Sequence, residues 1–387
     1  MTGDWQFLAT GITGAFSAFH LSLGHWLVAG MRKLRPVDLV RASALPTATV
    51  LVAARNEVKN ADSLVASLLA LEYPREKLRI VVVDDRSHDG TGEAIRNCGQ
   101  GRIDVLRVEI CPARIAPKKN ALMMGIRSSD SEIIAVIDAD NRPDPMWLWS
   151  HASRLQGSVG VSTGVVYHAR NPRLSDSFQG IWAAEIFNYA AISAGAIGNG
   201  FPLSANGGNL VYLRRAFDQA GAYARNLGIV SGDDDFLVQA IMARTPWRVD
   251  FAIEAATQVP TQGPVSWQHA WEQRKRWASK CVRFETPQLL LLSTTFASYC
   301  WVLLLAILGF SHHACWGMAA FLWGCMWLLG WRQYSTGLDI FGPKVRKSWF
   351  PLAMAMQIPL AVAASVLGTF GRFAWKDGAV RGGALEP

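Results

Sequence analysis

Long apolar runs stand at both ends of the chain and frame a middle section of shorter, alternating stretches. Residues 6–30 carry no Asp, Glu, Lys or Arg. At about 1.5 Å per residue, this run is long enough to cross a ~30 Å hydrocarbon core. Further apolar stretches follow at residues 288–310, 314–331 and 349–371, the last containing two prolines that membrane helices tolerate. The pattern predicts transmembrane helices at the N- and C-termini.

The middle section has the pattern of an α/β domain. Short β-branched runs that end in polar residues alternate with helical stretches, and residues 160–265 look mixed with Gly-rich turns. Such alternation predicts a doubly wound sheet, in which ligands bind beyond the carboxyl ends of the strands. The predicted strands are residues 47–57, 78–85, 104–109 and 132–140, and the predicted helices are residues 60–73 and 118–129.

Charge sets the expected orientation in the membrane. The net charge is +8, and basic clusters flank the apolar runs at residues 32–35, 274–280 and 344–347. The positive-inside rule places these clusters, and the domain between them, in the cytoplasm. Counting spans then puts the C-terminus outside, although Arg372, Lys376 and Arg381 lie there. Either the last segment is re-entrant or the rule is weakly obeyed.

Composition narrows the class of protein. Half of the 387 residues are hydrophobic, and the sequence contains no zinc-finger spacing or other nucleic-acid signature, so we expect no nucleic-acid partner. The cysteines form no CxxC pair, and we expect them to be free thiols in a reducing compartment. They are Cys98, Cys111, Cys281, Cys300, Cys315 and Cys325.

Acidic residues follow two of the predicted strands. Asp84 and Asp85 end the second strand, where a carboxylate can accept hydrogen bonds from a base or a ribose. A capped turn with Gly90 at positive φ is the structural alternative. Asp138 and Asp140 follow a later strand and can share a hard divalent cation, Mg²⁺ or Mn²⁺, that keeps positions open for phosphate oxygens. A solvated acidic turn is the alternative there.

Two further motifs stand closer to the C-terminus. Asp233, Asp234 and Asp235 precede an apolar run, and one of these carboxylates can act as a general base or simply cap a helix. Residues 266–283 have the spacing of a helix at the membrane interface, with an ordinary surface helix as the alternative. This helix contains a Gln-x-x-Arg-Trp sequence at Gln273, Arg276 and Trp277, which suits a diphosphate and a sugar face.

The order of these motifs, with Asn206-Gly207-Gly208-Asn209 among them, resembles the family-2 inverting glycosyltransferases over residues 47–283. That family includes cellulose, chitin and hyaluronan synthases and ceramide glucosyltransferase. The resemblance implies a GT-A-like mixed α/β sheet and a metal-dependent transferase that uses a nucleotide sugar, with a UDP-sugar expected. The third motif is Gly-Asp-Asp-Asp rather than Thr-Glu-Asp, which leaves the choice of base ambiguous.

The resemblance also implies a role for each matching residue. Donor-binding residues would be Ala53, Glu57, Asp84, Asp85, Lys119 and Asp138. Asp140, with Asp138, would bind the metal. Asp234 would be the general base, with Asp233 in reserve. Gln273, Arg276 and Trp277 would close over the diphosphate and the acceptor.

Four segments are expected. They are an N-terminal transmembrane helix (1–35), a catalytic domain (46–265), an interfacial helix (266–285) and a C-terminal region of about three transmembrane helices (286–375). We expect a multi-pass protein of the bacterial inner membrane with a cytoplasmic catalytic domain.

About four membrane segments leave little protein for a polysaccharide channel, so we expect a lipid acceptor. A processive polysaccharide synthase is the runner-up, because Gln-x-x-Arg-Trp also occurs in those enzymes. A non-catalytic nucleotide-binding assembly protein is the alternative from another class. The donor sugar, the acceptor and the choice between Mg²⁺ and Mn²⁺ stay open.

Overall fold

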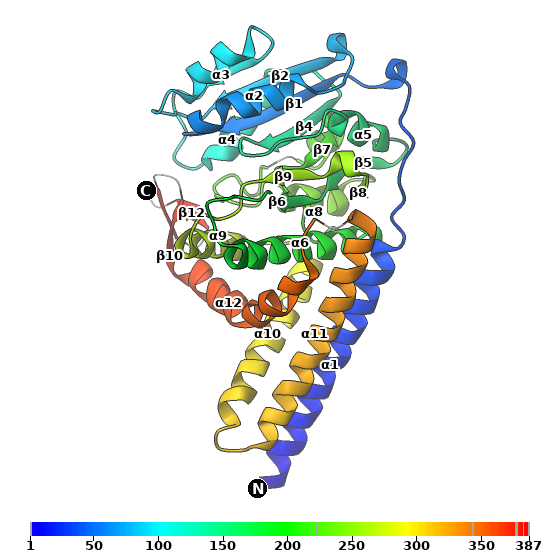
Figure 1. Ribbon diagram of the computed structural model, residues 1–387, viewed down its shortest axis with the longest axis vertical. Coiled ribbons are helices and arrows are strands. Elements are labelled where there is room, and N and C mark those ends of the chain that lie inside the picture. Colours follow the sequence, from blue (N-terminus) through cyan, green and yellow to red (C-terminus); the bar gives the residue numbers. More distant parts are fainter. Residues whose placement is uncertain (1, 222, 343, 376–377, 382, 386–387) are drawn as a thin grey trace.

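The protein has an α/β body above a stem of long helices (Figure 1). The computed structural model describes all residues except 1, 222, 343, 376–377, 382 and 386–387. The N-terminus lies at the far tip of the stem, and the C-terminal residues lie beside the body (Figure 1).

The body is built on a seven-stranded mixed sheet in the order β3-β2-β1-β4-β7-β5-β8. β1, β2, β3 and β4 run parallel, whereas β7 is antiparallel to both of its neighbours. All four strands predicted from the apolar runs are present. The strands are β1 (Ala48–Ala54), β2 (Leu78–Asp84), β3 (Asp104–Arg107), β4 (Ile133–Asp138), β5 (Val159–Gly164), β7 (Leu210–Leu213) and β8 (Arg248–Ala252).

Helices pack on this sheet because their apolar faces join its core. In α4, for example, Leu122 and Ile126 are buried against the strands. A parallel pair of short strands, β6 (Val166–His168) and β9 (Val259–Thr261), lies beside the main sheet. The helices of the body are α2 (Ala61–Leu69), α3 (Thr91–Gly99), α4 (Pro117–Arg127), α5 (Trp147–Arg154), α7 (Arg214–Gln219) and α8 (Asp235–Arg244).

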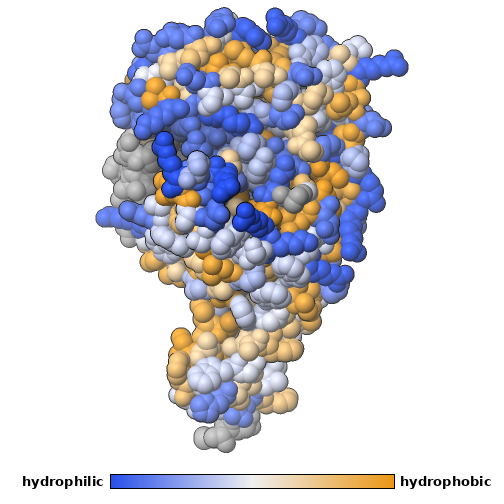
Figure 2. All heavy atoms as spheres, in the orientation of Figure 1, coloured by the Kyte–Doolittle hydropathy of each residue, from blue (hydrophilic) through white to orange (hydrophobic). Residues whose placement is uncertain are grey.

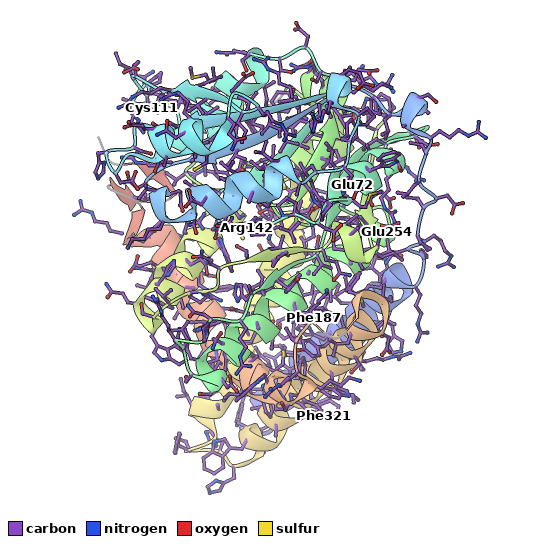
Figure 3. The ribbon with its side chains drawn as sticks, turned by 45° about the horizontal axis from the view of Figure 1, so that its top comes forward. Glu72, Cys111, Arg142, Phe187, Glu254 and Phe321 are labelled. Atoms are coloured by element: carbon purple, nitrogen blue, oxygen red, sulfur yellow. The ribbon has the colours of Figure 1, made fainter. Side chains whose placement is uncertain are left out.

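The long helix α6 (Asp176–Gly198) lies between the body and the stem (Figure 1). The sequence pattern did not distinguish this helix from the rest of residues 160–265. Its start is capped by Ser175, whose side chain accepts a hydrogen bond from the Phe178 amide at 3.3 Å. Phe187 of α6 points toward the stem, where its ring meets Tyr334 (Figure 3). α6 therefore joins the body to the stem.

Four helices are long and apolar enough to cross a membrane. They are α1 (Thr2–Met31), α10 (Thr286–Leu308), α11 (Ala314–Phe341) and α12 (Phe350–Phe370). α11 extends beyond the predicted apolar stretch 314–331, because residues 332–341 continue the helix. Leu338 and Phe341 are buried against α6, which favours continuation of the helix.

The last helix, α12, runs obliquely below the body, beside α9 (Trp267–Cys281), whereas α1, α10 and α11 form the stem (Figure 1). The chain then forms a small antiparallel sheet of β10 (Arg372–Trp375), β11 (Gly378–Arg381) and β12 (Ala384–Leu385). Both ends of α12 thus lie on the side of the body. α12 therefore does not run along the stem with α1, α10 and α11.

The surface matches this division. Figure 2 shows mostly polar residues over the body and many apolar residues on the stem. An exposed apolar surface of this extent is unusual on a soluble protein and suits contact with lipid chains. Among the large exposed apolar side chains of the stem are Phe7, Leu290, Ile307, Phe310 and Phe321.

Candidate functional site

Three neighbouring strands bring their carboxyl ends together at one edge of the sheet. β1 lies between β2 and β4, and its last residues face the predicted acidic positions. Ala54 pairs in register with Asp84, and Ala53 pairs with Asp138. The parallel pairing therefore brings these predicted donor-binding positions to one place.

The turn after β2 is held by its own acidic residues. Asp84 is 2% exposed and accepts a hydrogen bond from the Ser87 amide at 2.9 Å. Asp85 is 4% exposed and forms an ion pair with Arg86 at 2.9 Å. Gly90 has a φ of +87°, as its place in a tight turn predicts. Asp84 thus stabilises the turn, whereas Asp85 forms an ion pair.

Two residues at this edge have a backbone conformation that non-glycine residues rarely adopt. Asn56 has a φ of +55° and Arg86 a φ of +57°. Both turns are tied together, because the Asn56 amide donates to the Ser87 hydroxyl at 3.0 Å. Strained backbone of this kind is concentrated at functional sites.

Asp140 lies partly buried at this edge beside other carboxylates. Burial, and then the charge of Asp138, raise the pKa of Asp140 to about 6, with Glu57 adding to the effect. The Thr261 hydroxyl donates to the Asp140 carboxylate at 3.0 Å and opposes the shift. Arg142 lies nearby, under α2 (Figure 3), where it donates to the Ser63 hydroxyl at 2.6 Å.

Lys118 links two of the acidic motifs. Its ammonium lies 2.9 Å from the Asp138 carboxylate and 3.0 Å from that of Asp233. Burial would lower the pKa of Lys118, but these carboxylates raise it. Burial alone would raise the pKa of Asp233, but the Lys118 charge and hydrogen bond, together with the charges of Lys119 and Lys280, lower this pKa. Lys118 was not identified from the sequence, and its neighbour Lys119 was assigned the donor-binding role instead.

Lys119, the predicted donor-binding lysine, points the other way. It is 1% exposed, and its ammonium donates to the backbone carbonyls of Asn226 and Ile229 at 2.6 and 2.9 Å. Leu122 and Ile126, three and seven residues later, lie buried on the same side of α4. This helical spacing was the signal that could have assigned Lys118 to the site.

The acidic triplet begins α8. Gly232 turns the chain with a φ of +83°, and Asp234 caps the helix by accepting from the Asp235 amide at 2.8 Å. Asp234 also accepts from the Gly207 amide at 2.8 Å. Burial, and then Asp234, raise the pKa of Asp235 to about 6, although Lys280 forms an ion pair with it.

The Asn206–Asn209 turn approaches the metal-binding candidates closely. A Cβ on Gly208 would lie 2.9 Å from an oxygen of Asp138 and 2.2 Å from the Asn141 amide nitrogen. That nitrogen donates to the Gly208 carbonyl at 2.9 Å. Only a glycine leaves room for this arrangement.

The Gln-x-x-Arg-Trp helix, α9, directs its arginine toward the carboxylates. Burial lowers the pKa of Arg276, and four carboxylates oppose that shift: Asp138, Asp233, Asp234 and Asp140. Arg274, Lys275 and Lys280 are buried rather than exposed to solvent. Trp277 stands edge-to-face with Tyr189 of α6.

Within the described ranges, no group of three His, Cys, Asp or Glu side chains is arranged to hold a metal ion. Mg²⁺ commonly uses one or two carboxylates together with substrate phosphates. Asp138 and Asp140 match that smaller donor set. All six cysteines are free thiols, as predicted.

Comparison with known proteins agrees with these observations. Residues 49–219 match the family described as glycosyl transferase family 2. A probable glycosyltransferase, YdaM, from Bacillus subtilis is 26% identical over 60% of this chain and 55% of its own. A β-monoglucosyldiacylglycerol synthase from Trichormus variabilis is 27% identical over 61% of this chain and 49% of its own. This chain thus spans about half the length of these curated relatives.

A solved structure extends the likeness to nearly the whole fold. The mannosyltransferase PcManGT from Pyrobaculum calidifontis, solved with GDP-Man and Mn²⁺, superposes with a TM-score of 0.57. It is 18% identical in sequence, and the match covers 93% of this chain and 98% of that one. Residues 49–219 of this chain therefore match glycosyl transferase family 2, and the chain has the GT-A fold.

Proposed function

We propose that this protein is a membrane-bound inverting glycosyltransferase that moves a sugar from a nucleotide sugar to a lipid acceptor. The observation that carries the proposal is the convergence of three motifs, distant in sequence, on one edge of the sheet. Lys118 bridges Asp138 and Asp233, and Arg276 faces the same carboxylates. This arrangement provides acidic groups for a cation and a base beside basic groups for a diphosphate.

The donor would lie across the ends of β1, β2 and β4. Ala53, Glu57, Asp84 and Asp85 would hold the nucleoside, and a UDP-sugar is the donor that we propose. Lys118 takes the place that the sequence assigned to Lys119, because its ammonium is on the side of the carboxylates.

The chemistry of the donor set fits a divalent cation. Asp140 has a raised pKa because burial and neighbouring carboxylates disfavour its charge, and a cation would offset that charge. The buried side-chain oxygen of Asn141 has no hydrogen-bond partner, which adds a potential oxygen ligand. Asp138 and Asp140 would hold Mg²⁺ or Mn²⁺, which supplies charge compensation for a departing diphosphate.

Transfer would be a single in-line displacement. Asp234 would take the proton of an acceptor hydroxyl while that oxygen bonds to the anomeric carbon. The bond from this carbon to the diphosphate oxygen breaks, and the nucleoside diphosphate leaves beside Arg276. Asp234 suits the base better than Asp233, because its side chain is more exposed (16% against 10%) and its contact with Lys280, at 3.6 Å, is longer than the 3.0 Å contact between Asp233 and Lys118.

Two observations support a lipid acceptor. The stem and α12 place the site next to surfaces that suit a bilayer, and one relative is named for a glucosylated diacylglycerol. We therefore propose an inner-membrane protein with its body on the cytoplasmic side.

Purified protein mixed with nucleotide sugars, Mg²⁺ or Mn²⁺ and membrane lipid extract tests this proposal. We expect release of nucleoside diphosphate and one glycosylated lipid. A ladder of oligomers from a single donor would instead show a polysaccharide synthase. Absence of any release across all donors would favour a non-catalytic binding protein. Asp234→Asn should keep donor binding and lose transfer, and full turnover in that variant would reject the base.

A further inference from the structure

The small C-terminal sheet packs on the segment that leads to the acidic triplet. Val230 is 4% exposed and forms a buried cluster with Phe373 of β10 and Val380 of β11, which are 4% and 0% exposed. None of these residues belongs to the proposed donor or acceptor sites. The contact therefore needs a separate explanation.

Backbone pairing reinforces this contact. The Val230 amide donates to the Gly383 carbonyl at 2.8 Å. Ile229 and Ala384 form an antiparallel β-bridge. The last strand thus pairs with residues 229–230, as an added strand pairs with a sheet edge.

The same segment is held from its other side by α4. The Lys119 ammonium donates to the carbonyls of Asn226 and Ile229. The Ala116 amide donates to the Leu227 carbonyl at 2.7 Å. Residues 226–230 therefore lie clamped between α4 and the C-terminal sheet.

The clamp lies immediately before the proposed base. Ser231 and Gly232 alone separate Val230 from Asp233, and the Ser231 hydroxyl lies 3.4 Å from the Arg276 guanidinium. With so short a connection, a shift of Val230 moves the start of α8. A displacement of about 1 Å at a catalytic group can cost ~100-fold in rate.

We infer that the C-terminal sheet is a brace that positions Asp233 and Asp234 for transfer, with Phe373 and Val380 as positioning residues. The inference rests on the proposed function, because it concerns the proposed base. Most of the proposed donor-binding residues lie at the ends of β1, β2 and β4, so weakening the brace should lower kcat more than it weakens donor binding.

Phe373→Ala in the full chain tests the brace. We expect a fall in kcat of about tenfold or more, as for a misplaced catalytic group, with donor affinity within about threefold of wild type. Hydrogen exchange at the Val230 amide should speed up by about tenfold or more, because its bonded partner is loosened. Phe373→Leu, which keeps most of the apolar contact, should restore both values.

Phe370→Ala is the matched control, since that ring is 78% exposed at the end of α12. It should change neither kcat nor exchange. Faster exchange at Val230 with unchanged kcat would overturn the inference, and so would lower kcat with unchanged exchange. If Phe373→Ala does not fold, Val380→Ala takes its place with the same criteria. Wild-type protein without any transfer activity would reject the proposed function itself, whatever the exchange data show.

Discussion

Arg274 and Glu185 form an ion pair between α9 and α6 in which each side chain is only 4% exposed. Tyr189 adds a hydrogen bond to the same carboxylate at 3.1 Å. Arg274 also donates to the Gln273 side chain at 2.7 Å, and its guanidinium lies over the Trp277 ring at 5.1 Å. One buried charge thus orients two members of the Gln-x-x-Arg-Trp motif.

Glu185→Gln should be strongly destabilising. The change leaves the Arg274 charge buried without its counter-charge, which typically costs about 3–5 kcal/mol. Denaturant unfolding in detergent measures the effect, and transfer should fall with it.

Glu272→Gln serves as the control, because Glu272 pairs with Lys275 on the same helix and its side chain is 26% exposed. Partly exposed pairs contribute about 0–1 kcal/mol. An equal loss of unfolding free energy in Glu185→Gln and Glu272→Gln would contradict the larger stabilisation that we assign to the buried pair.

Lys118→Gln should weaken transfer. Removal of the Lys118 ammonium leaves Asp138 and Asp233 facing each other without a cation between them. A charged hydrogen bond is worth about 1.5–3 kcal/mol, so we expect kcat/KM to fall by roughly 10- to 100-fold. Steady-state kinetics at saturating cation check this, and an unchanged kcat/KM would exclude Lys118 from the site.

Gly208→Ala should disable the site without unfolding the sheet. The added methyl group would meet the Asp138 carboxylate and the Asn141 amide, both held by their own contacts. We expect at least about a tenfold loss of turnover, since catalytic geometry tolerates little displacement. Gly14→Ala, where nothing lies within 4 Å of the new Cβ, should be neutral. Equal turnover by Gly208→Ala and Gly14→Ala would contradict the close approach of Gly208 to Asp138 and Asn141.

The buried Lys119 side chain should make the free energy of unfolding depend on pH in the alkaline range. Burial lowers its folded-state pKa from 10.5 to about 8. Between these values the unfolded chain binds more protons than the folded one, so this group's contribution to the free energy of unfolding rises with pH. Lys119→Met should remove that rise. The difference between wild type and variant, measured from pH 8 to 10.5, should increase, and a flat or falling difference would contradict the assignment.

Strand ends were the most predictable part of the site. Asp84 and Asp138 follow apolar β-branched runs, and parallel pairing on β1 brings them together. Lys118 and Lys119 were harder, because adjacent residues on a helix point in different directions and only the spacing to Leu122 and Ile126 distinguishes them.

Other features left little trace in the sequence. Arg274 looks like a surface charge until Glu185, distant in sequence, is placed beside it. The strands of the C-terminal sheet have two to four residues each, too short for a recognisable alternation. Their position depends on α12 returning to the body, which apolar content alone does not decide.

The central claim is that a cation at Asp140 and the guanidinium of Arg276 jointly hold the donor diphosphate. Calorimetric titration of nucleoside diphosphate into wild type, Asp140→Asn and Arg276→Gln, each with and without Mg²⁺ or Mn²⁺, tests it most directly. We predict that the cation tightens binding to wild type, that Asp140→Asn loses this gain, and that Arg276→Gln weakens binding by roughly 10- to 100-fold in both conditions. The same cation-dependent gain in Asp140→Asn as in wild type would contradict the account.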